Sequence, residues 1–141
     1  MTPAQHELIR HSWYRAAPVR EQIIRDFYGH LFEQAPALRD LFPADLGRQK
    51  RKLLITLNIA VSRLSRLEQI RPSLRELGRR HRDYGARTEY YPVVCEALLW
   101  SLATHMGSDF DRATEFAWRE ALSTITTEML AGAREIPEQT D

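Results

Sequence analysis

One stretch decides the fold of this 141-residue chain: residues 74–85 read LRELGRRHRDYG. Leu74, Leu77, His81 and Tyr84 recur at helical spacing, which places His81 on the apolar side of a helix. A buried imidazole needs a partner, and a carbonyl, a carboxylate or a metal ion could serve. Taken alone, His81 is more simply explained as a hydrogen-bonded core residue, so the rest of the chain has to decide between these partners.

The composition is that of an ordinary globular domain, with 43% hydrophobic and 28% charged residues. The 20 basic and 19 acidic side chains leave no basic excess that would favour nucleic acid. No apolar run approaches the length of a membrane span, and the first residues lack the regions of a signal peptide. The single cysteine, Cys95, excludes an internal disulfide. We therefore expect a cytoplasmic protein with neither nucleic acid nor membrane as a partner.

Hydrophobic periodicity predicts helices along the whole chain. Proline, glycine and capping signals divide them as follows: 4–17 after an N-cap at Thr2, 19–34, a short turn at 37–41, 46–67, a helix opened by Pro72 and closed by Gly85, a helix opened by Pro92, and 110–134 with Phe116 on its apolar side. We expect residues 1–135 to form one domain and residues 136–141 to be a frayed tail.

Four of these helices each carry one polar or aromatic side chain on an otherwise apolar face. These side chains are Tyr28, Gln49, His81 and Tyr91. An all-helical chain of this length commonly forms either a four-helix bundle or a globin-like array around a pocket. A bundle core would hold aliphatic side chains at such positions, whereas four polar or aromatic groups that converge would line a pocket that can bind a ligand. The pattern favours the second architecture.

The chain resembles the globins, and closely the single-domain bacterial globins akin to the haem domain of flavohaemoglobins. The resemblance runs from Trp13 to Leu130. It is carried by FYGHLF at 27–32, PALRDLF at 36–42, LGRRH at 77–81 and YYPVV at 90–94. It implies an all-α globin fold, a three-over-three helical sandwich around a haem pocket. The implied cofactor is haem b, because no Cys-x-x-Cys-His motif is present to attach haem covalently.

The resemblance also implies roles for individual residues. His81 matches the proximal iron ligand, and Tyr28 and Gln49 match the distal residues that bind dioxygen. Phe42 matches the aromatic residue that packs against the haem face, and Leu53 matches a distal aliphatic residue. Tyr91 matches the tyrosine that supports the proximal side. Further candidate haem contacts are Lys52, Arg80 and Arg48 for the propionates, and Leu57, Leu77, Val94 and Leu98 for the ring. A solvated basic face and ordinary core packing explain these last residues equally well.

The distal pair indicates a function through its hydrogen bonds. A phenol O–H and an amide N–H can both donate to a diatomic ligand that gains negative charge at the iron. Each such bond is worth roughly 1.5–3 kcal/mol, so two would slow oxygen release by about a hundredfold or more. A globin that releases oxygen so slowly is suited to hold it until nitric oxide arrives. We therefore favour nitric oxide dioxygenation to nitrate, with a separate reductase as electron donor.

One position departs from the family pattern. Members that run this chemistry place a glutamate late in the last helix, near the proximal histidine, where this chain has Ala133; Glu135 lies on a different face. Two other interpretations therefore stay open: an oxygen-storing or oxygen-scavenging globin, and, ranked last, a haem-based sensor whose output domain is not visible. The sequence does not separate the enzyme from the oxygen carrier.

Overall fold

The computed structural model describes residues 1–135, and the tail predicted at 136–141 lies outside the described residues. Within the described part the chain forms helices and no strand. The α-helices are α1 (Pro3–Arg15), α2 (Arg20–Gln34), α3 (Gly47–Ser62), α4 (Leu67–Asp83), α5 (Tyr90–Met106) and α6 (Arg112–Ala133). Short 3₁₀ turns lie at Ala17–Val19, Pro36–Leu41, Leu64–Arg66 and Gly107–Asp109.

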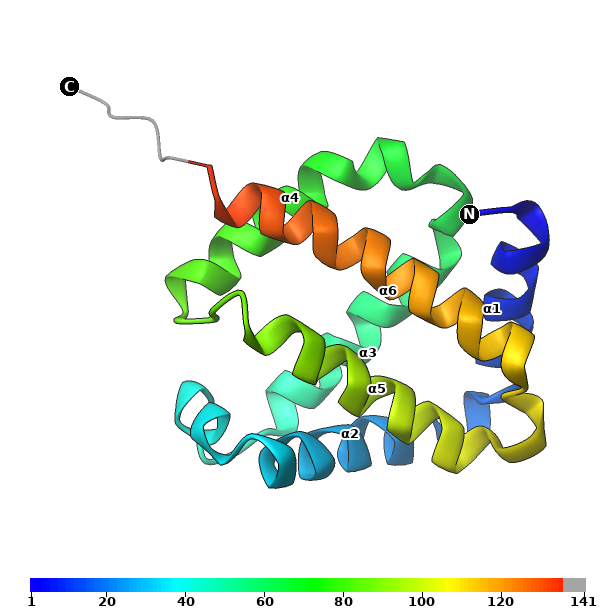
Figure 1. Ribbon diagram of the computed structural model, residues 1–141. Helices are drawn as coiled ribbons and strands as arrows, with labels where there is room; N and C mark the ends of the chain where they lie inside the picture. The colour runs from blue at the N-terminus through cyan, green and yellow to red at the C-terminus, as the bar shows by residue number, and fades with distance from the viewer. Residues whose placement is uncertain (136–141) are drawn as a thin grey trace.

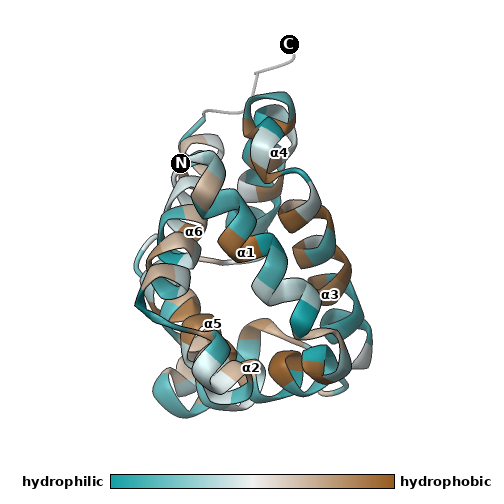
Figure 2. Ribbon diagram, turned by 90° about the vertical axis from the view of Figure 1, so that its right-hand side faces the viewer, coloured by the Kyte–Doolittle hydropathy of each residue, from teal (hydrophilic) through white to brown (hydrophobic). Residues whose placement is uncertain are grey.

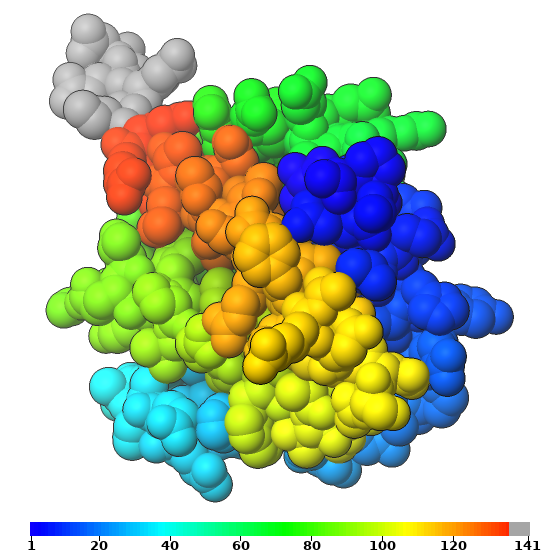
Figure 3. Space-filling view, turned by 45° about the vertical axis from the view of Figure 1, so that its right-hand side comes forward, coloured from blue at the N-terminus to red at the C-terminus, as the bar shows by residue number. Residues whose placement is uncertain are grey.

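The helices form the two layers of the three-over-three globin sandwich predicted from the sequence. α6 packs against α4 and α1, and α2 packs against α5 and α3 (Figure 1). Figure 3 shows α1, in dark blue, directly beside the yellow-to-orange α6. The most deeply buried side chains, among them Ile9, Ile23, Leu31 and Leu102, fill the space between these layers. No helix within residues 1–135 combines the length and the apolarity that crossing a bilayer requires.

Two predicted helix boundaries were wrong. The helix predicted at 46–67 ends at Ser62, and Arg63 leaves the helical conformation with φ −113° and ψ 14°. The next helix begins at Leu67 rather than at Pro72, which lies inside α4. A proline near the start of a helix removes one hydrogen bond without ending the helix when packing holds the turn before it. Here Ile70, in that turn, is buried.

Two expectations about exposure also need correction. Phe116 is 56% exposed, because its neighbours Ala117 and Trp118 occupy the inward face of α6. Tyr84 is 69% exposed, because it caps the C-terminus of α4, where the helical periodicity ends. Near the end of α5, His105 is mostly buried and bonded to another helix.

That bond ties α5 to α2. His105 Nε2 lies 2.7 Å from Asp26 Oδ2, and one turn earlier the Ser101 hydroxyl donates to the Ile23 carbonyl at 2.7 Å. Hydrogen bonds from Arg25 and, second, from His105 lower the pKa of Asp26. A carboxylate whose pKa is depressed in the folded state stabilises the fold above its unfolded pKa of about 4 and loses that contribution as the pH falls through the folded value.

We expect Asp26→Asn to destabilise the protein at pH 7 and to have a shrinking effect as the pH falls below about 4. The loss should not exceed about 1 kcal/mol, because the Asp26 side chain is one-third exposed. Urea unfolding across this pH range measures it. Asp40→Asn is the matched control, since Asp40 is exposed and forms no ion pair within the described residues. A loss at pH 7 that persists unchanged at pH 3 would contradict the assignment.

Candidate functional site

His81 lies near the end of α4 with its ring half-buried. Its Nδ1 is 2.7 Å from the carbonyl oxygen of Leu77, one turn earlier on the same helix. A carbonyl can only accept, so Nδ1 carries a proton, and the lone pair of the neutral ring is then on Nε2. A neutral ring oriented in this way by a backbone acceptor is the form in which histidine binds a metal. The geometry of His81 therefore fits the predicted role of an iron ligand.

The position of α4, and hence of His81, depends on a backbone contact with α6. A Cβ atom on Gly78 would lie 1.8 Å from the carbonyl oxygen of Met129, and one on Gly132 would lie 2.0 Å from that of Arg75. Real side chains never approach so closely, so only glycine fits at both positions. The two helix backbones touch one turn before His81.

Arginines of α4 reinforce this crossing on both sides. Arg71 and Arg75 bind Glu128 of α6 at 3.3 and 3.1 Å. Nearer to His81, Arg79 binds Glu135, and Arg82 donates to the carbonyls of Ala133 and Glu135 at 3.1 and 2.8 Å. Glu135 thus neutralises an arginine of α4. None of these bonds was predicted from the sequence.

The distal candidates meet between α2 and α3. Tyr28 is 3% exposed on α2, and Gln49 is half-buried on α3. Burial raises the pKa of the Tyr28 phenol, and the Gln49 side-chain amide, within hydrogen-bonding reach of that phenol, opposes the rise. Because burial dominates, the phenol keeps its proton at neutral pH and can donate a hydrogen bond.

An aromatic cluster surrounds Tyr28. The Tyr28 ring lies 5.8 Å from that of Phe42, and Phe32 lies 5.4 Å from Phe42, both edge to face. Arg39 fixes the turn that presents Phe42: it stacks 5.2 Å over Phe32 and donates to the carbonyls of Phe42, Pro43 and Ala44. The role of Arg39 could not be predicted from the sequence, because no sequence pattern indicates an arginine that donates hydrogen bonds to successive carbonyl groups.

The remaining predicted haem contacts divide by exposure. Leu57 and Leu98 are buried, and Leu53 and Val94 are half-buried against the same core cluster that contains Tyr28. Leu77, half-buried, lies outside this cluster. The basic candidates Lys52, Arg80 and Arg48 are exposed, and Arg80 lies 3.6 Å from Glu76 on its own helix. Nothing in these contacts directs the three cations toward a propionate.

Tyr91, at the start of α5, has an unusual hydroxyl. Within the described residues it is the only buried side-chain oxygen or nitrogen without a hydrogen-bond partner. It borders a cavity of about 280 Å³ between α5 and α6, lined also by Cys95, Thr126 and Leu130. The carboxylate that the family pattern places on this side is absent, since the residue there is Ala133 and Glu135 binds Arg79. No hydrogen bond among residues 1–135 therefore links Tyr91 to His81.

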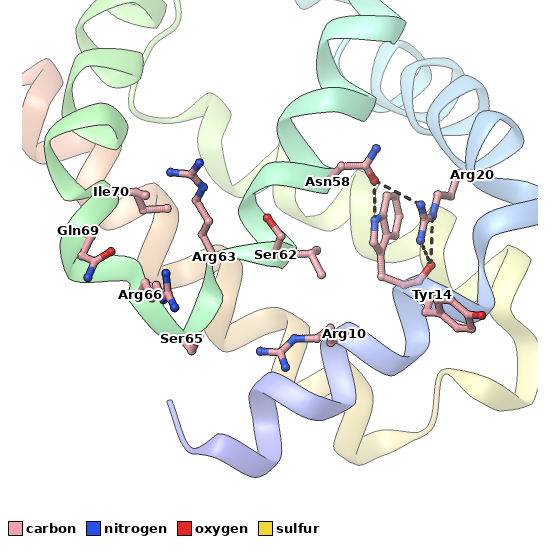
Figure 4. Close-up of a pocket in the computed structure, with 12 residues that line it drawn as sticks. Arg10, Tyr14, Arg20, Asn58, Ser62, Arg63, Ser65, Arg66, Gln69 and Ile70 are labelled. Carbon is pink, nitrogen blue, oxygen red and sulfur yellow. Dashed lines mark hydrogen bonds between the residues drawn. The ribbon is translucent and has the colours of Figure 1, made fainter.

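A second cavity lies elsewhere in the molecule. It has a volume of about 930 Å³ and opens between α1, α3 and the start of α4 (Figure 4). Its lining includes Trp13, Arg20, Asn58 and Arg66, and none of the residues predicted to contact haem. This cavity is therefore separate from the candidate haem site.

Comparison with known proteins defines the family. The globin family model matches residues 25–129, so the chain belongs to the globins. A flavohemoprotein of Bacillus thuringiensis is 29% identical over 84% of this chain, and one of Halalkalibacterium halodurans is 31% identical over 74%. The chain spans only 30% and 26% of these two relatives. Neuroglobin-1 of Oncorhynchus mykiss is 27% identical, with 94% of this chain and 92% of that protein covered.

Solved structures agree on the fold. A bacterial globin of Campylobacter jejuni superposes with a TM-score of 0.83 at 23% identity, covering 94% of this chain and 96% of that one. An engineered carbene transferase from Rhodothermus marinus, described as a candidate nitric oxide dioxygenase, has a TM-score of 0.83 at 22% identity, with 94% and 93% covered.

Haem is the cofactor of globins and hence of this chain. The residues present fit it: His81 offers a free Nε2, and the aromatic and apolar groups around Tyr28 suit a flat apolar ring. No group of three or more His, Cys, Asp or Glu side chains that could hold a metal ion occurs in residues 1–135. His81 is thus the candidate through which this chain holds the iron.

Gly78→Ala is expected to lower the free energy of unfolding by about 2 kcal/mol or more and to speed haem loss, because α4 must move away from α6 to admit the methyl group. Gly29→Ala, within α2, is the matched control: no atom lies within 4 Å of its Cβ, and alanine should stabilise the helix by about 0.5–1 kcal/mol. Urea unfolding and haem transfer to apomyoglobin measure both effects. Equal midpoints for the two variants would refute the backbone contact.

Proposed function

We propose that this globin binds dioxygen tightly through Tyr28 and Gln49 and converts nitric oxide to nitrate, with electrons from a separate reductase. The observation that carries the proposal is the meeting of a buried, protonated phenol and a side-chain amide on two facing helices. The flavohemoprotein relatives support it, as does the likeness to a candidate nitric oxide dioxygenase.

Haem supplies the iron that binds dioxygen and the one-electron chemistry by which nitric oxide, dioxygen and one electron become nitrate. Tyr28 donates its Oη proton to the diatomic ligand as a hydrogen bond and keeps that proton, because burial holds the phenol neutral. Gln49 donates from its Nε2 amide, and the apolar side chains of Leu53 and Leu57 exclude water. Together the two donors retain dioxygen long enough for nitric oxide to arrive.

His81 would hold the haem iron through Nε2, and the Leu77 carbonyl orients the His81 ring. The proximal hydrogen bond is therefore to a neutral backbone acceptor. A carboxylate acceptor would make the imidazole more electron-donating. The turnover also needs one electron for each nitric oxide consumed, which requires a reductase that meets the protein in a reducing compartment such as the cytoplasm.

A second function, storage or scavenging of oxygen, is favoured by a specific observation. The Tyr91 hydroxyl has no hydrogen-bond partner among residues 1–135, and the residue at the family's glutamate position is Ala133. Retention of oxygen requires only the distal donors. An oxygen store would share the slow release of oxygen and would lack fast, repeated nitrate formation.

Tyr28→Phe should speed dioxygen release by about tenfold or more, and Gln49→Leu by a similar or smaller factor, because each removes one donor worth roughly 1.5–3 kcal/mol. The double variant should show coupling, since both donors bind one ligand. Stopped-flow release rates measure this. Release within twofold of wild type in both single variants would exclude the distal clamp, and Phe32→Leu controls for loss of aromatic packing alone.

Nitrate yield separates the enzyme from the oxygen store. We expect the oxygenated protein to consume one nitric oxide and form one nitrate per haem, and to turn over repeatedly when ascorbate and a redox mediator regenerate the ferrous state. Tyr28→Phe should lower the yield per haem because oxygen escapes first. Slow oxygen release together with nitrate formation that stops after one turnover would instead support the storage function.

A further inference from the structure

The charges of this chain are distributed unevenly. Residues 46–67 contain six basic side chains and no acidic one: Arg48, Lys50, Arg51, Lys52, Arg63 and Arg66. The rest of the chain carries 14 basic and 19 acidic side chains. The near-neutral total therefore hides a strongly cationic segment, made of α3 and the turn that follows it, on an otherwise anionic protein.

These six cations have no anionic partner in the part of the chain that the structure describes. Among the described residues, none of the six forms an ion pair, whereas ten arginines outside the segment do. Most arginines outside residues 46–67 are thus neutralised by acidic side chains of the described chain. The positive charge of α3 remains available to a partner.

Apolar side chains lie among these cations. Ile55 and Ile59, one turn apart on α3, are 57% and 49% exposed, and Arg51 lies one turn before them on the same side. We call the exposed side of this helix the α3 face; it consists of Arg48, Arg51, Lys52, Ile55, Ile59 and Arg63. α3 runs along one edge of the molecule in Figure 2, with both hydrophobic and hydrophilic segments. An apolar centre within a charged rim is typical of a protein–protein interface.

The large cavity of Figure 4 continues the α3 face at its C-terminal end. Arg10, Arg20, Arg63 and Arg66 line it, and no carboxylate does. Arg20 is held in place, because it stacks 4.5 Å over Trp13 and donates to the Trp13 carbonyl at 2.6 Å. A cleft of about 930 Å³ with this lining can receive acidic side chains that protrude from a partner.

We propose that the α3 face and this cavity form the docking surface for an acidic electron-donor protein, a proposal that rests on the need of the proposed function for one electron per turnover. Charge complementarity selects the partner: an anionic surface is steered to the segment of the described chain in which six cations without ion pairs are concentrated. The same helix carries Gln49 and Leu53 on its inner side. A donor docked on α3 therefore lies one helix away from the haem site.

The experiment measures reduction of the ferric, haem-loaded protein by reduced plant-type ferredoxin, an acidic iron–sulfur protein with a potential of about −400 mV. Nitric oxide and dioxygen are both excluded, so the outcome does not depend on dioxygenation. Second-order rate constants are determined by stopped flow at several ionic strengths. The variants are the double charge reversal Arg51→Glu/Arg63→Glu and, for the apolar centre, Ile59→Ser.

The matched control is Arg112→Glu/Arg134→Glu on α6, which changes the net charge equally at two exposed arginines without ion pairs among residues 1–135. We expect the α3 double variant to be slower by about tenfold or more at low ionic strength, with a weaker salt dependence, and the control to stay within about twofold of wild type. Ile59→Ser should slow the reaction at high salt too, because its contribution is not electrostatic. Dithionite should reduce all variants at similar rates.

Equal rates and equal salt dependence in the α3 variant and the α6 control would overturn the proposal, because net charge alone would then govern the encounter. A failure of nitrate formation with chemical reductants would overturn the proposed function and leave the measured rates of reduction by ferredoxin unaffected. The two ideas are thus tested by separate readouts.

Discussion

The close approach of the α4 and α6 backbones at Gly78 and Gly132 is the constraint on which the rest of the site depends. It brings the backbones of α4 and α6 together one turn before His81. Leu77, whose carbonyl orients the His81 ring, is the neighbour of Gly78, so the direction of the imidazole follows from where the two helices cross. Ion pairs from Arg75 to Glu128 and from Arg79 to Glu135 hold that crossing on both sides.

The two sides of the site are therefore built in different ways. The proximal side is positioned by main-chain contacts that tolerate no side chain, whereas the distal side is made of side chains: Tyr28, Gln49 and the aromatic rings around Phe42. Substitutions on the distal side change hydrogen bonding within an intact fold, and ligand affinity can vary there without moving the helices. Substitutions at the crossing of α4 and α6 would move His81, the candidate iron ligand, itself.

Much of this arrangement could be predicted from the sequence, and the rest depended on contacts between distant residues. Helical spacing identified the helices and the inward position of His81, and the family resemblance assigned Tyr28 and Gln49 to one site, for which their distal role stays a prediction. The close approaches of Gly78 to Met129 and of Gly132 to Arg75 join residues far apart in the chain, and no local pattern indicates them. Arg39 was missed because its bonds are to carbonyls. α4 began earlier than predicted because burial of Ile70 outweighed the local preference of Pro72.

Pro72 separates two parts of α4 that have different neighbours. It has no N–H, so the Glu68 carbonyl receives no helical hydrogen bond from it. Before it, Gln69 and Ile70 line the large cavity and Arg71 binds Glu128 of α6, whereas the backbone contact with α6 lies after it, at Arg75 and Gly78. Since segments with fewer contacts open more easily, we expect the amide hydrogens of residues 67–71 to exchange faster than those of residues 75–81. A change in the shape of the cavity would then leave the position of His81 unchanged.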